Sequence, residues 1–448
     1  MLRRKKAPEI FEYLSKPDQA LLVTGARQTG KTYLIREMCK QTGKRFVEFN
    51  LIEQPDAALA LQTARTAEDA LLRLSLLAAA PMIPGETIIF LDEIQEAGDI
   101  VTLIKFLVDD GKYQYVLSGS LLGVEMNDIR SVPVGYMHPV ELFPLDFMEF
   151  LWALGVQDNT IEQLRKHFET LEPIDEIVHR KLMELYHLYL IIGGMPQAVQ
   201  RYVDTKDLRQ VGEVLKDIIR LYKRDFTKYE KKNKLKLNSI YDLIPSELNK
   251  QNKRFVFTYL NKQLKFDRYE NSFLWLKDAG VAIPVYLVAN PVFPLEQSKS
   301  SNLFKLFMND VGLLNSYYST DVKLKILSQD AAVNNGALYE NAVAQQLIAN
   351  DLPLYYLNNR NIGEVDFITE WNDECVPIEV KSGNDYMLHT ALNRLMNHPD
   401  LHLKQSIVFC KSNISQKEPH LYLPIYLSMF LTNREMDSVP VPFDISGL

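Results

Sequence analysis

The chain has 448 residues, of which 47% are hydrophobic, 24% charged and 10% aromatic, a composition typical of soluble globular proteins with roughly two to four domains at this length. Lysine and arginine total 50 against 57 aspartates and glutamates, which gives a formal net charge of −7. This charge excludes a whole-surface attraction for DNA, so any contact with nucleic acid needs a local basic patch.

The first 120 residues alternate short apolar runs with helical patterns. Runs such as ALLVT and TIIFL are continuously apolar, as expected for parallel strands that are buried on both faces. This alternation predicts a parallel α/β domain over residues 1–150. Its expected strands are residues 20–24, 45–50, 87–91 and 115–118, and its expected helices are residues 33–41 and 67–79.

Three further regions are expected after this domain. Apolar residues recur every three or four positions up to about residue 226, which predicts an α-helical lid over residues 151–230. Residues 231–292 join short helical patterns to the alternating run VAIPVYLVA, and helices followed by a hairpin indicate a winged helix. Residues 293–448 mix a helix near residues 339–350 with several strand patterns and are expected to form a second α/β unit.

A phosphate-binding loop follows the first expected strand. The sequence GARQTGKT has the pattern GxxxxGKT and stands between a strand and a helix. Backbone N–H groups of such a loop surround the β-phosphate, Lys31 reaches the β- and γ-phosphates, and the Thr32 hydroxyl binds Mg²⁺. The sequence therefore predicts ATP and Mg²⁺ as ligands. The expected nucleotide-binding residues of this loop are Gly25, Ala26, Arg27, Gln28, Thr29, Gly30, Lys31 and Thr32.

Two adjacent carboxylates end the strand TIIFLD. We expect Asp92 to hold the Mg²⁺ and its water shell, and Glu93 to act as the general base that polarises the attacking water. A glutamate at this point is typical of P-loop ATPases with an additional strand in the sheet. The next strand ends in Ser118-Gly119-Ser120, so the hydroxyl of Ser118 or of Ser120 is expected to sense the γ-phosphate.

At this point the sequence resembles prokaryotic AAA-type ATPases whose C-terminal half is a domain of unknown function with a restriction-endonuclease-like fold. The shared segments extend over nearly the whole chain and are specific as a set. Many relatives carry Gly-Arg where this chain has Gly135-Tyr136, so the resemblance provides no arginine there. The shared segments are GARQTGKT, FLDEIQ, LSGS, FPLDFMEF, IGGMPQAV, LYKRDFTKY, IPSELNKQNKRF, WLKDAG, FKLFMNDVGLL, EVDF and IEVKSG.

A second cluster of charged residues lies in the C-terminal unit. Because side chains alternate along a strand, Glu379 and Lys381 project to one face, and a neighbouring strand can place Asp366 beside them. Two carboxylates bind Mg²⁺ through oxygen, and a lysine can orient or deprotonate water for attack on a phosphodiester. With Glu340 on a helix, this looks like the PD-(D/E)xK nuclease arrangement. The alternative is a buried ion-pair network without catalysis.

Basic residues suggest contacts with phosphate at two further places. The segment KRDFTKYEKKNKLK, residues 223–236, is rich in lysine, and Lys250, Lys253 and Arg254 extend it. This patch could bind DNA beside a winged helix, or it could be an ordinary solvated face. Arg130 and Arg224 are candidates for contact with the nucleotide, with surface salt bridges as the alternative.

The three cysteines, Cys39, Cys375 and Cys410, stand far apart and in no metal-ligand spacing. Disulfide and structural-zinc frameworks are therefore not expected, and a reducing cytoplasm fits best. The basic N-terminus lacks the apolar core of a signal peptide. The most apolar window, residues 70–83, is shorter than the roughly 20 residues of a membrane helix, so no contact through a membrane span is expected.

Three functions remain compatible with the sequence. The first is an ATP-driven enzyme that processes DNA with an active nuclease domain. The second is an ATP-dependent switch whose C-terminal half only binds DNA or a protein partner, and the third is a protein-remodelling ATPase. All three hydrolyse ATP, and a homo-oligomer is expected to matter because AAA-type sites are often completed by an arginine of a neighbouring subunit.

Overall fold

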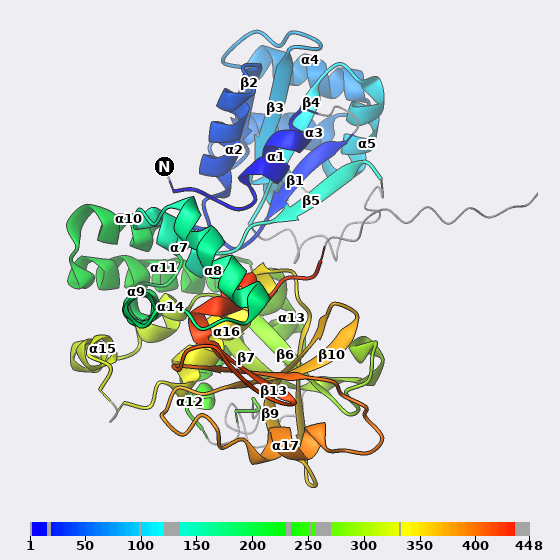
Figure 1. The fold of residues 1–448 in the computed structure, drawn as a ribbon. Helices are drawn as coiled ribbons and strands as arrows, with labels where there is room; N and C mark the ends of the chain where they lie inside the picture. The colour runs from blue at the N-terminus through cyan, green and yellow to red at the C-terminus, as the bar shows by residue number, and fades with distance from the viewer. Residues whose placement is uncertain are drawn as a thin grey trace, which may run out of the picture.

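The computed structural model contains two β-sheets with helices between them (Figure 1). Within the part of the chain that the structure describes, the first sheet has five strands and the second has eight. None of the described helices is long and apolar enough to cross a membrane. The structure describes residues 2–15, 19–97, 100–120, 135–229, 234–250, 253–255, 270–330 and 333–434, without the side chains of residues 101–102, 228–229 and 234–235.

The first sheet is parallel and has the strand order β2-β3-β4-β1-β5. Strand β3 is buried along its whole length, which explains its continuously apolar sequence. Strand β4 lies between β1 and β3, so the carboxyl ends of these three strands meet at one edge. The predicted parallel α/β sheet is confirmed. Its strands are β1 (Ala20–Thr24), β2 (Arg45–Asn50), β3 (Thr87–Asp92), β4 (Gln114–Ser118) and β5 (Met137–Glu141).

Helices cover both faces of this sheet. On one face, Ile10 and Leu34 pack against Val23. On the other face, Leu61 and Leu74 belong to a second cluster that contains alternate residues of the same strands. The helices of the first face are α1 (Ala7–Tyr13) and α2 (Lys31–Gln41), and those of the second face are α3 (Pro55–Thr63), α4 (Ala67–Leu77) and α5 (Ile100–Asp110).

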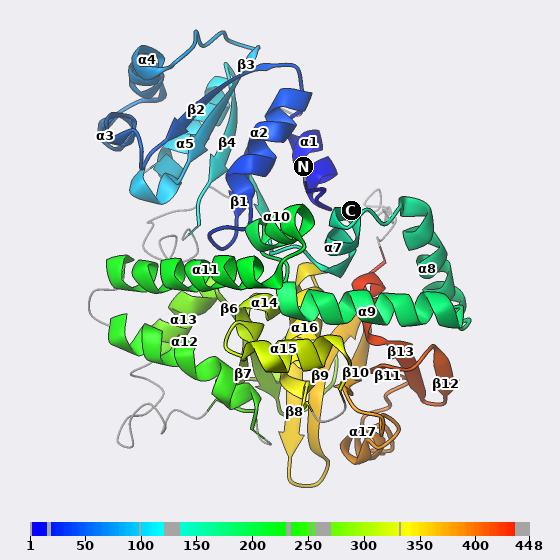
Figure 2. The same ribbon diagram turned by 90° about the vertical axis from the view of Figure 1, so that its left-hand side faces the viewer.

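A layer of helices follows and lies between the two sheets (Figure 2). Helix α7 begins at a capping box in which Asp146 and Glu149 exchange side-chain and backbone hydrogen bonds, a device that satisfies the free N–H groups of a first helical turn. The helical pattern predicted for residues 151–230 is present in the described residues. The helices are α7 (Phe147–Ala153), α8 (Asp158–Thr170), α9 (Glu176–Ile192), α10 (Pro196–Thr205) and α11 (Leu208–Tyr229).

The second sheet is mixed and has the order β12-β13-β11-β10-β9-β8-β6-β7. Strands β8, β9 and β10 form an antiparallel meander, and β11 joins β10 in parallel after helix α17. The strands are β6 (Ala282–Val288), β7 (Lys299–Met308), β8 (Leu354–Asn359), β9 (Gly363–Trp371), β10 (Glu374–Val380), β11 (Ser406–Cys410), β12 (Ser415–Lys417) and β13 (His420–Pro424). The helices are α12 (Lys234–Leu248), α13 (Glu270–Asp278), α14 (Val311–Asn315), α15 (Thr320–Leu327), α16 (Gly336–Ala349) and α17 (Thr390–Met396).

The hairpin that suggested a winged helix belongs to this second sheet. Strands β6 and β7 pair with each other, but β6 also pairs with β8. The alternating pattern therefore reflects two strands at the edge of a large sheet, where one face is less covered than the other. A separate winged-helix sheet is not found among the described part of residues 231–292.

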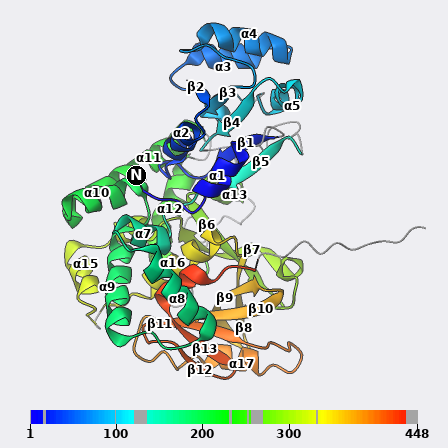
Figure 3. The same cartoon turned by 45° about the horizontal axis from the view of Figure 1, so that its top comes forward.

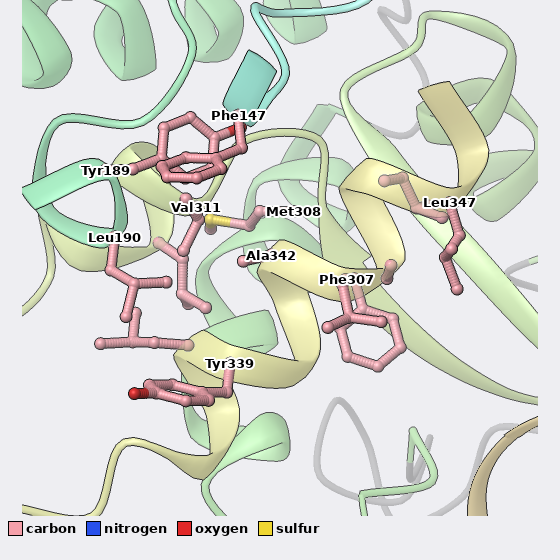
Figure 4. Packing of buried hydrophobic residues seen from close by; sticks show 14 of the residues in the cluster. Phe147, Tyr189, Leu190, Phe307, Met308, Val311, Tyr339, Ala342 and Leu347 are labelled. Atoms are coloured by element: carbon pink, nitrogen blue, oxygen red, sulfur yellow. The ribbon is translucent and has the colours of Figure 1, made fainter. Parts of the chain in front are cut away.

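One hydrophobic core joins the helical layer to the second sheet. Phe147 and Tyr189 of the helical layer lie close to Val311 and Met308, and Ala342 of α16 lies next to them (Figure 4). Buried residues occur on every side of α16, as expected for a helix that is surrounded by protein. The helical layer is therefore packed on the C-terminal half and does not form a separate core.

Candidate functional site

The turn between β1 and α2 has the backbone of a phosphate-binding loop. Gly25 has φ +130°, and Gly30, which precedes α2, has φ +90°. A Cβ at Gly25 would lie 2.2 Å from the carbonyl oxygen of Leu142, so this position needs glycine for both conformation and space. The first turn of α2 follows directly, and its free N–H groups and helix dipole favour a bound anion.

Lys31 lies inside the loop beside two acids. Its Nζ donates hydrogen bonds of 2.9 Å to the carbonyl oxygens of Gly25 and Ala26. Burial lowers the pKa of Lys31 to about 8, and the charges of Glu93 and Asp92 oppose this shift. The ammonium group is thus held in a poorly solvated place where a phosphate would be a strong partner.

Asp92 at the end of β3 collects polar groups from its neighbours. Thr32 Oγ1 donates to Asp92 Oδ2 at 3.0 Å, Asn50 Nδ2 lies 3.4 Å from the same oxygen, and Ser118 Oγ donates to Oδ1. Burial raises the pKa of Asp92. A hydroxyl and a carboxylate at hydrogen-bonding distance are the hard oxygen donors that Mg²⁺ prefers, so Thr32 and Asp92 fit the magnesium ion expected with ATP.

Glu93 follows with φ +59°, an uncommon conformation for a non-glycine residue. Gln95 Nε2 donates to Glu93 Oε2 at 2.6 Å, and Ser120 Oγ donates to the same oxygen at 3.3 Å. The two serines after β4 therefore have different partners, since Ser118 contacts Asp92 and Ser120 contacts Glu93. Their assignment as γ-phosphate sensors stays a prediction.

Two cavities adjoin the loop. The first, of about 700 Å³, is lined by Lys31, Thr32 and Glu93 and by residues of α10 and α11. The second, of about 560 Å³, shares Gly30 with the first and has a more apolar lining. Volumes of this size are typical of small-molecule sites. Lining residues of the second cavity include Leu2, Tyr33, Leu34 and Pro196.

A buried arginine at the N-terminus supports the loop. Arg4 donates to the carbonyl oxygen of Thr29 at 2.7 Å and to that of Phe143 at 2.5 Å, and its Nε lies 3.2 Å from Glu149 Oε1. From the sequence, this basic N-terminus was not expected to contribute to the nucleotide site. The position of a buried arginine beside α7 depends on tertiary packing, and no local pattern indicates it.

The comparisons with known proteins agree with this geometry. Residues 17–151 match the family model of an AAA domain. The chain contains an AAA-type P-loop domain. Residues 183–324 and 335–428 match two models that are described as domains of unknown function, DUF8612 and DUF4143. These two matches leave the predicted restriction-endonuclease-like fold of the C-terminal half unconfirmed.

Two broader comparisons complete these findings. A Walker-type ATPase of Pyrococcus abyssi aligns over 70% of this chain and 95% of its own, at 13% sequence identity and a TM-score of 0.42. No curated protein matches this chain.

The structure brings the four predicted C-terminal residues together. Strands β9 and β10 pair so that Phe367 lies opposite Ile378, which places Asp366 next to Glu379. Asp366 Oδ2 accepts a hydrogen bond of 2.9 Å from Val380 N, and Lys381 Nζ donates to Glu379 Oε1 at 2.8 Å. Glu340 of α16 is buried, and its pKa is raised by burial and by the charge of Asp366.

Two further lysines complete this cluster. Lys305 of β7 is fully buried, with Nζ 2.7 Å from Glu364 Oε1 and 3.9 Å from Asp366 Oδ1. Lys253 forms an ion pair with Glu340. Lys305 was not predicted from the sequence, although a single lysine within the apolar segment LFKLFM could have indicated it. Lys253 was assigned to the surface patch. Three lysines therefore face four carboxylates.

The charged forms of the cluster's glutamates are disfavoured despite these lysines. Burial, together with the charge of Asp366, raises the pKa of Glu379 to about 8 and that of Glu340 to about 7, although the neighbouring lysines oppose the shift. Glu340 Oε2 and Glu379 Oε2 are buried without a hydrogen-bond partner. Within the described residues, no three His, Cys, Asp or Glu side chains are arranged to hold a metal ion, so the predicted metal site at Asp366 and Glu379 stays a prediction.

The basic patch is only partly described. Lys223 pairs with Asp242, and Lys250 pairs with Glu247. Lys231 and Lys232 lie outside the described residues, as does Arg130. Arg224 is exposed on α11. Lys223 and Lys250 thus form ion pairs within the protein, and DNA binding by this segment is not supported.

Proposed function

We propose that this protein binds and hydrolyses Mg·ATP at the β1–α2 loop and uses the bound nucleotide to control its C-terminal half. The observation that carries the proposal is that Lys31, Thr32 and Glu93 line a cavity of about 700 Å³ together with residues of α10 and α11, while Thr32 donates a hydrogen bond to Asp92. The protein would act as a switch because α10 and α11, which line the nucleotide cavity, are packed on the C-terminal half.

Each group has a distinct role in this proposal. Lys31 neutralises charge on the phosphates, and Thr32 and Asp92 would hold Mg²⁺, which stabilises the negative charge of the transferred phosphoryl group. Glu93 takes the proton of the attacking water, and Gln95 and Ser120 orient its carboxylate. The second, more apolar cavity beside Tyr33 suits the nucleoside.

Substitution of Lys31 and Glu93 separates binding from hydrolysis. Lys31→Ala should abolish measurable binding of Mg·ATP in calorimetry, because Lys31 is the residue expected to neutralise the β- and γ-phosphates. Glu93→Gln should retain binding and lower turnover by about 10² to 10⁴, the usual contribution of a general base. Arg220→Ala, an exposed position on α11, provides the control. Full affinity in Lys31→Ala, or normal turnover in Glu93→Gln, would contradict these assignments.

For the C-terminal half, the ion pairs favour a domain that binds a partner over one that cuts DNA. Every acid of the cluster that the sequence analysis named is already close to a lysine. A metal-dependent nuclease is the second candidate, and one observation supports it. Two buried carboxylate oxygens of the cluster, Oε2 of Glu340 and Oε2 of Glu379, have no hydrogen-bond partner.

A plasmid-cleavage assay decides between these two candidates. The full-length protein would be incubated with DNA and Mg²⁺ or Mn²⁺, beside an Asp366→Ala control. We expect no cleavage that depends on Asp366. Cleavage by the wild type that disappears in Asp366→Ala would establish the nuclease.

A further inference from the structure

Arg27 connects the phosphate-binding loop to the helical layer. It is the third residue of the loop and lines the same cavity as Lys31 and Glu93. Its NH1 lies 2.5 Å from Asp225 Oδ1 on α11, and its Nε donates to Ser120 Oγ at 3.3 Å. Since Ser120 also contacts Glu93, the guanidinium group lies one hydroxyl away from the expected general base.

Helix α11 holds the loop at a second point. Tyr222, one turn before Asp225, is buried and donates from its hydroxyl to the carbonyl oxygen of Arg27 at 3.0 Å. Asn309 Nδ2 in turn donates to the Tyr222 hydroxyl at 3.4 Å. Asn309 follows β7, the strand that carries Lys305 of the acidic cluster. A short chain of contacts therefore leads from the nucleotide loop through α11 to the second sheet, which lies at the bottom of Figure 3.

We propose that Arg27 exchanges Asp225 for the γ-phosphate when Mg·ATP binds, so that α11 is latched to the loop only when no γ-phosphate is present. This inference rests on the proposed ATP site. A guanidinium group binds phosphate in the same bidentate way as carboxylate, and a terminal phosphate carries more charge than one carboxylate. The side chain of Arg27 already lines the cavity in which Lys31 would hold that phosphate.

The exchange has a consequence for α11. The side chain of Asp225 is only 10% exposed and that of Arg27 is 24% exposed. When Arg27 turns to the phosphate, Asp225 loses the ion pair that ties α11 to the loop. Helix α11 can then move relative to the loop, and with it Tyr222 and its contact to Asn309. The latch thus gives the C-terminal half a means of responding to the γ-phosphate.

Two substitutions should change the preference for triphosphate over diphosphate in opposite directions. The dissociation constants of Mg·ATPγS and Mg·ADP would be measured calorimetrically for the full-length protein. Asp225→Asn removes the competing carboxylate and should raise the affinity ratio of ATPγS to ADP by about tenfold, whereas Arg27→Ala should lower it by about tenfold. The control, Arg220→Ala, removes an exposed arginine of the same helix that pairs with Asp217 and should leave the ratio unchanged.

Hydrogen exchange of α11 gives an independent readout. Amides of residues 219–227 should exchange faster with Mg·ATPγS than with Mg·ADP in the wild type, and fast with both nucleotides in Arg27→Ala. Equal exchange in both states of the wild type, or equal effects of both substitutions on the two nucleotides, would overturn the latch and leave the nucleotide site intact. Failure of the wild type to bind either nucleotide would overturn the ATP site itself.

Discussion

Lys31 links the electrostatics of the loop to a measurable pH dependence. Its pKa of about 8 lies below the usual lysine value because burial disfavours the charged form. As the pH rises through this value, the free protein loses the positive charge that phosphate needs. We therefore expect the affinity for Mg·ATP to fall between about pH 7 and 9, roughly tenfold for each pH unit above 8.

Titration calorimetry across this range measures the effect. Lys40→Ala supplies a matched control, because Lys40 is an exposed lysine of the same helix whose pKa is raised by Glu37. This variant should keep the wild-type profile. An affinity that stays constant between about pH 7 and 9 would show that Lys31 remains charged throughout and that burial has little effect on it.

Single residues differ in how well the sequence identifies them. The loop and the acids Asp92 and Glu93 were predictable because their chemistry requires a fixed order along the chain. The partners Asp225, Tyr222 and Arg4 were not predictable as site residues, since each reaches the loop from a distant element. Lys253 was instead assigned to the wrong kind of site. Its neighbouring lysines suggested an exposed basic patch, but its side chain forms an ion pair with the buried Glu340.

Helix α16 holds several elements through buried amide side chains. Asn341 accepts from Met308 N at 2.9 Å and donates to Met308 O at 3.0 Å, and so replaces a strand partner at the end of β7. Gln345 Oε1 accepts from Val311 N, and Gln346 Oε1 accepts from Phe147 N. The helix therefore satisfies backbone groups of β7, α14 and α7 that would otherwise be buried without partners.

Replacing Asn341 by leucine should be strongly destabilising. Both backbone groups of Met308 would lose their partner in the core, and each unsatisfied group costs about 1–3 kcal/mol. Urea unfolding should thus give a free energy of unfolding lower by about 2–6 kcal/mol. Asn397→Ala, which removes an exposed local hydrogen bond to Asn393, should have almost no effect. A loss below about 0.5 kcal/mol in Asn341→Leu would mean that water replaces the amide.

At the level of elements, the hydrophobic pattern predicted strand β6 but not the sheet to which it belongs. Residues 282–288 were correctly expected to be part of a hairpin, yet the alternation of apolar residues does not say which strand lies next to it. The pairing of β6 with β8 brings together residues nearly seventy positions apart. Such long-range pairing is decided by packing of the whole C-terminal half, which explains why a winged helix was expected instead.

At the scale of the whole molecule, the described helical layer and C-terminal half share hydrophobic packing. A single hydrophobic core includes Phe147 of α7, Leu190 of α9 and Leu347 of α16. A fragment that starts near residue 300 would lose β6 and most of this helical layer, and would expose the apolar surfaces that they cover. Tests of the C-terminal cluster therefore require the full chain, in which Lys31→Ala removes the contribution of nucleotide-bound metal.

The metal dependence of unfolding decides what the acidic cluster does. In the Lys31→Ala background, we expect Mg²⁺ and Mn²⁺ to leave thermal unfolding unchanged, because Lys253, Lys305 and Lys381 already neutralise most of the cluster. A metal that bound only the folded state would stabilise it by about 2.7 kcal/mol at a hundredfold excess over its dissociation constant. If such an upward shift appeared and vanished on further substitution of Asp366 by alanine, the cluster would be a metal site and the nuclease would become the better function for the C-terminal half.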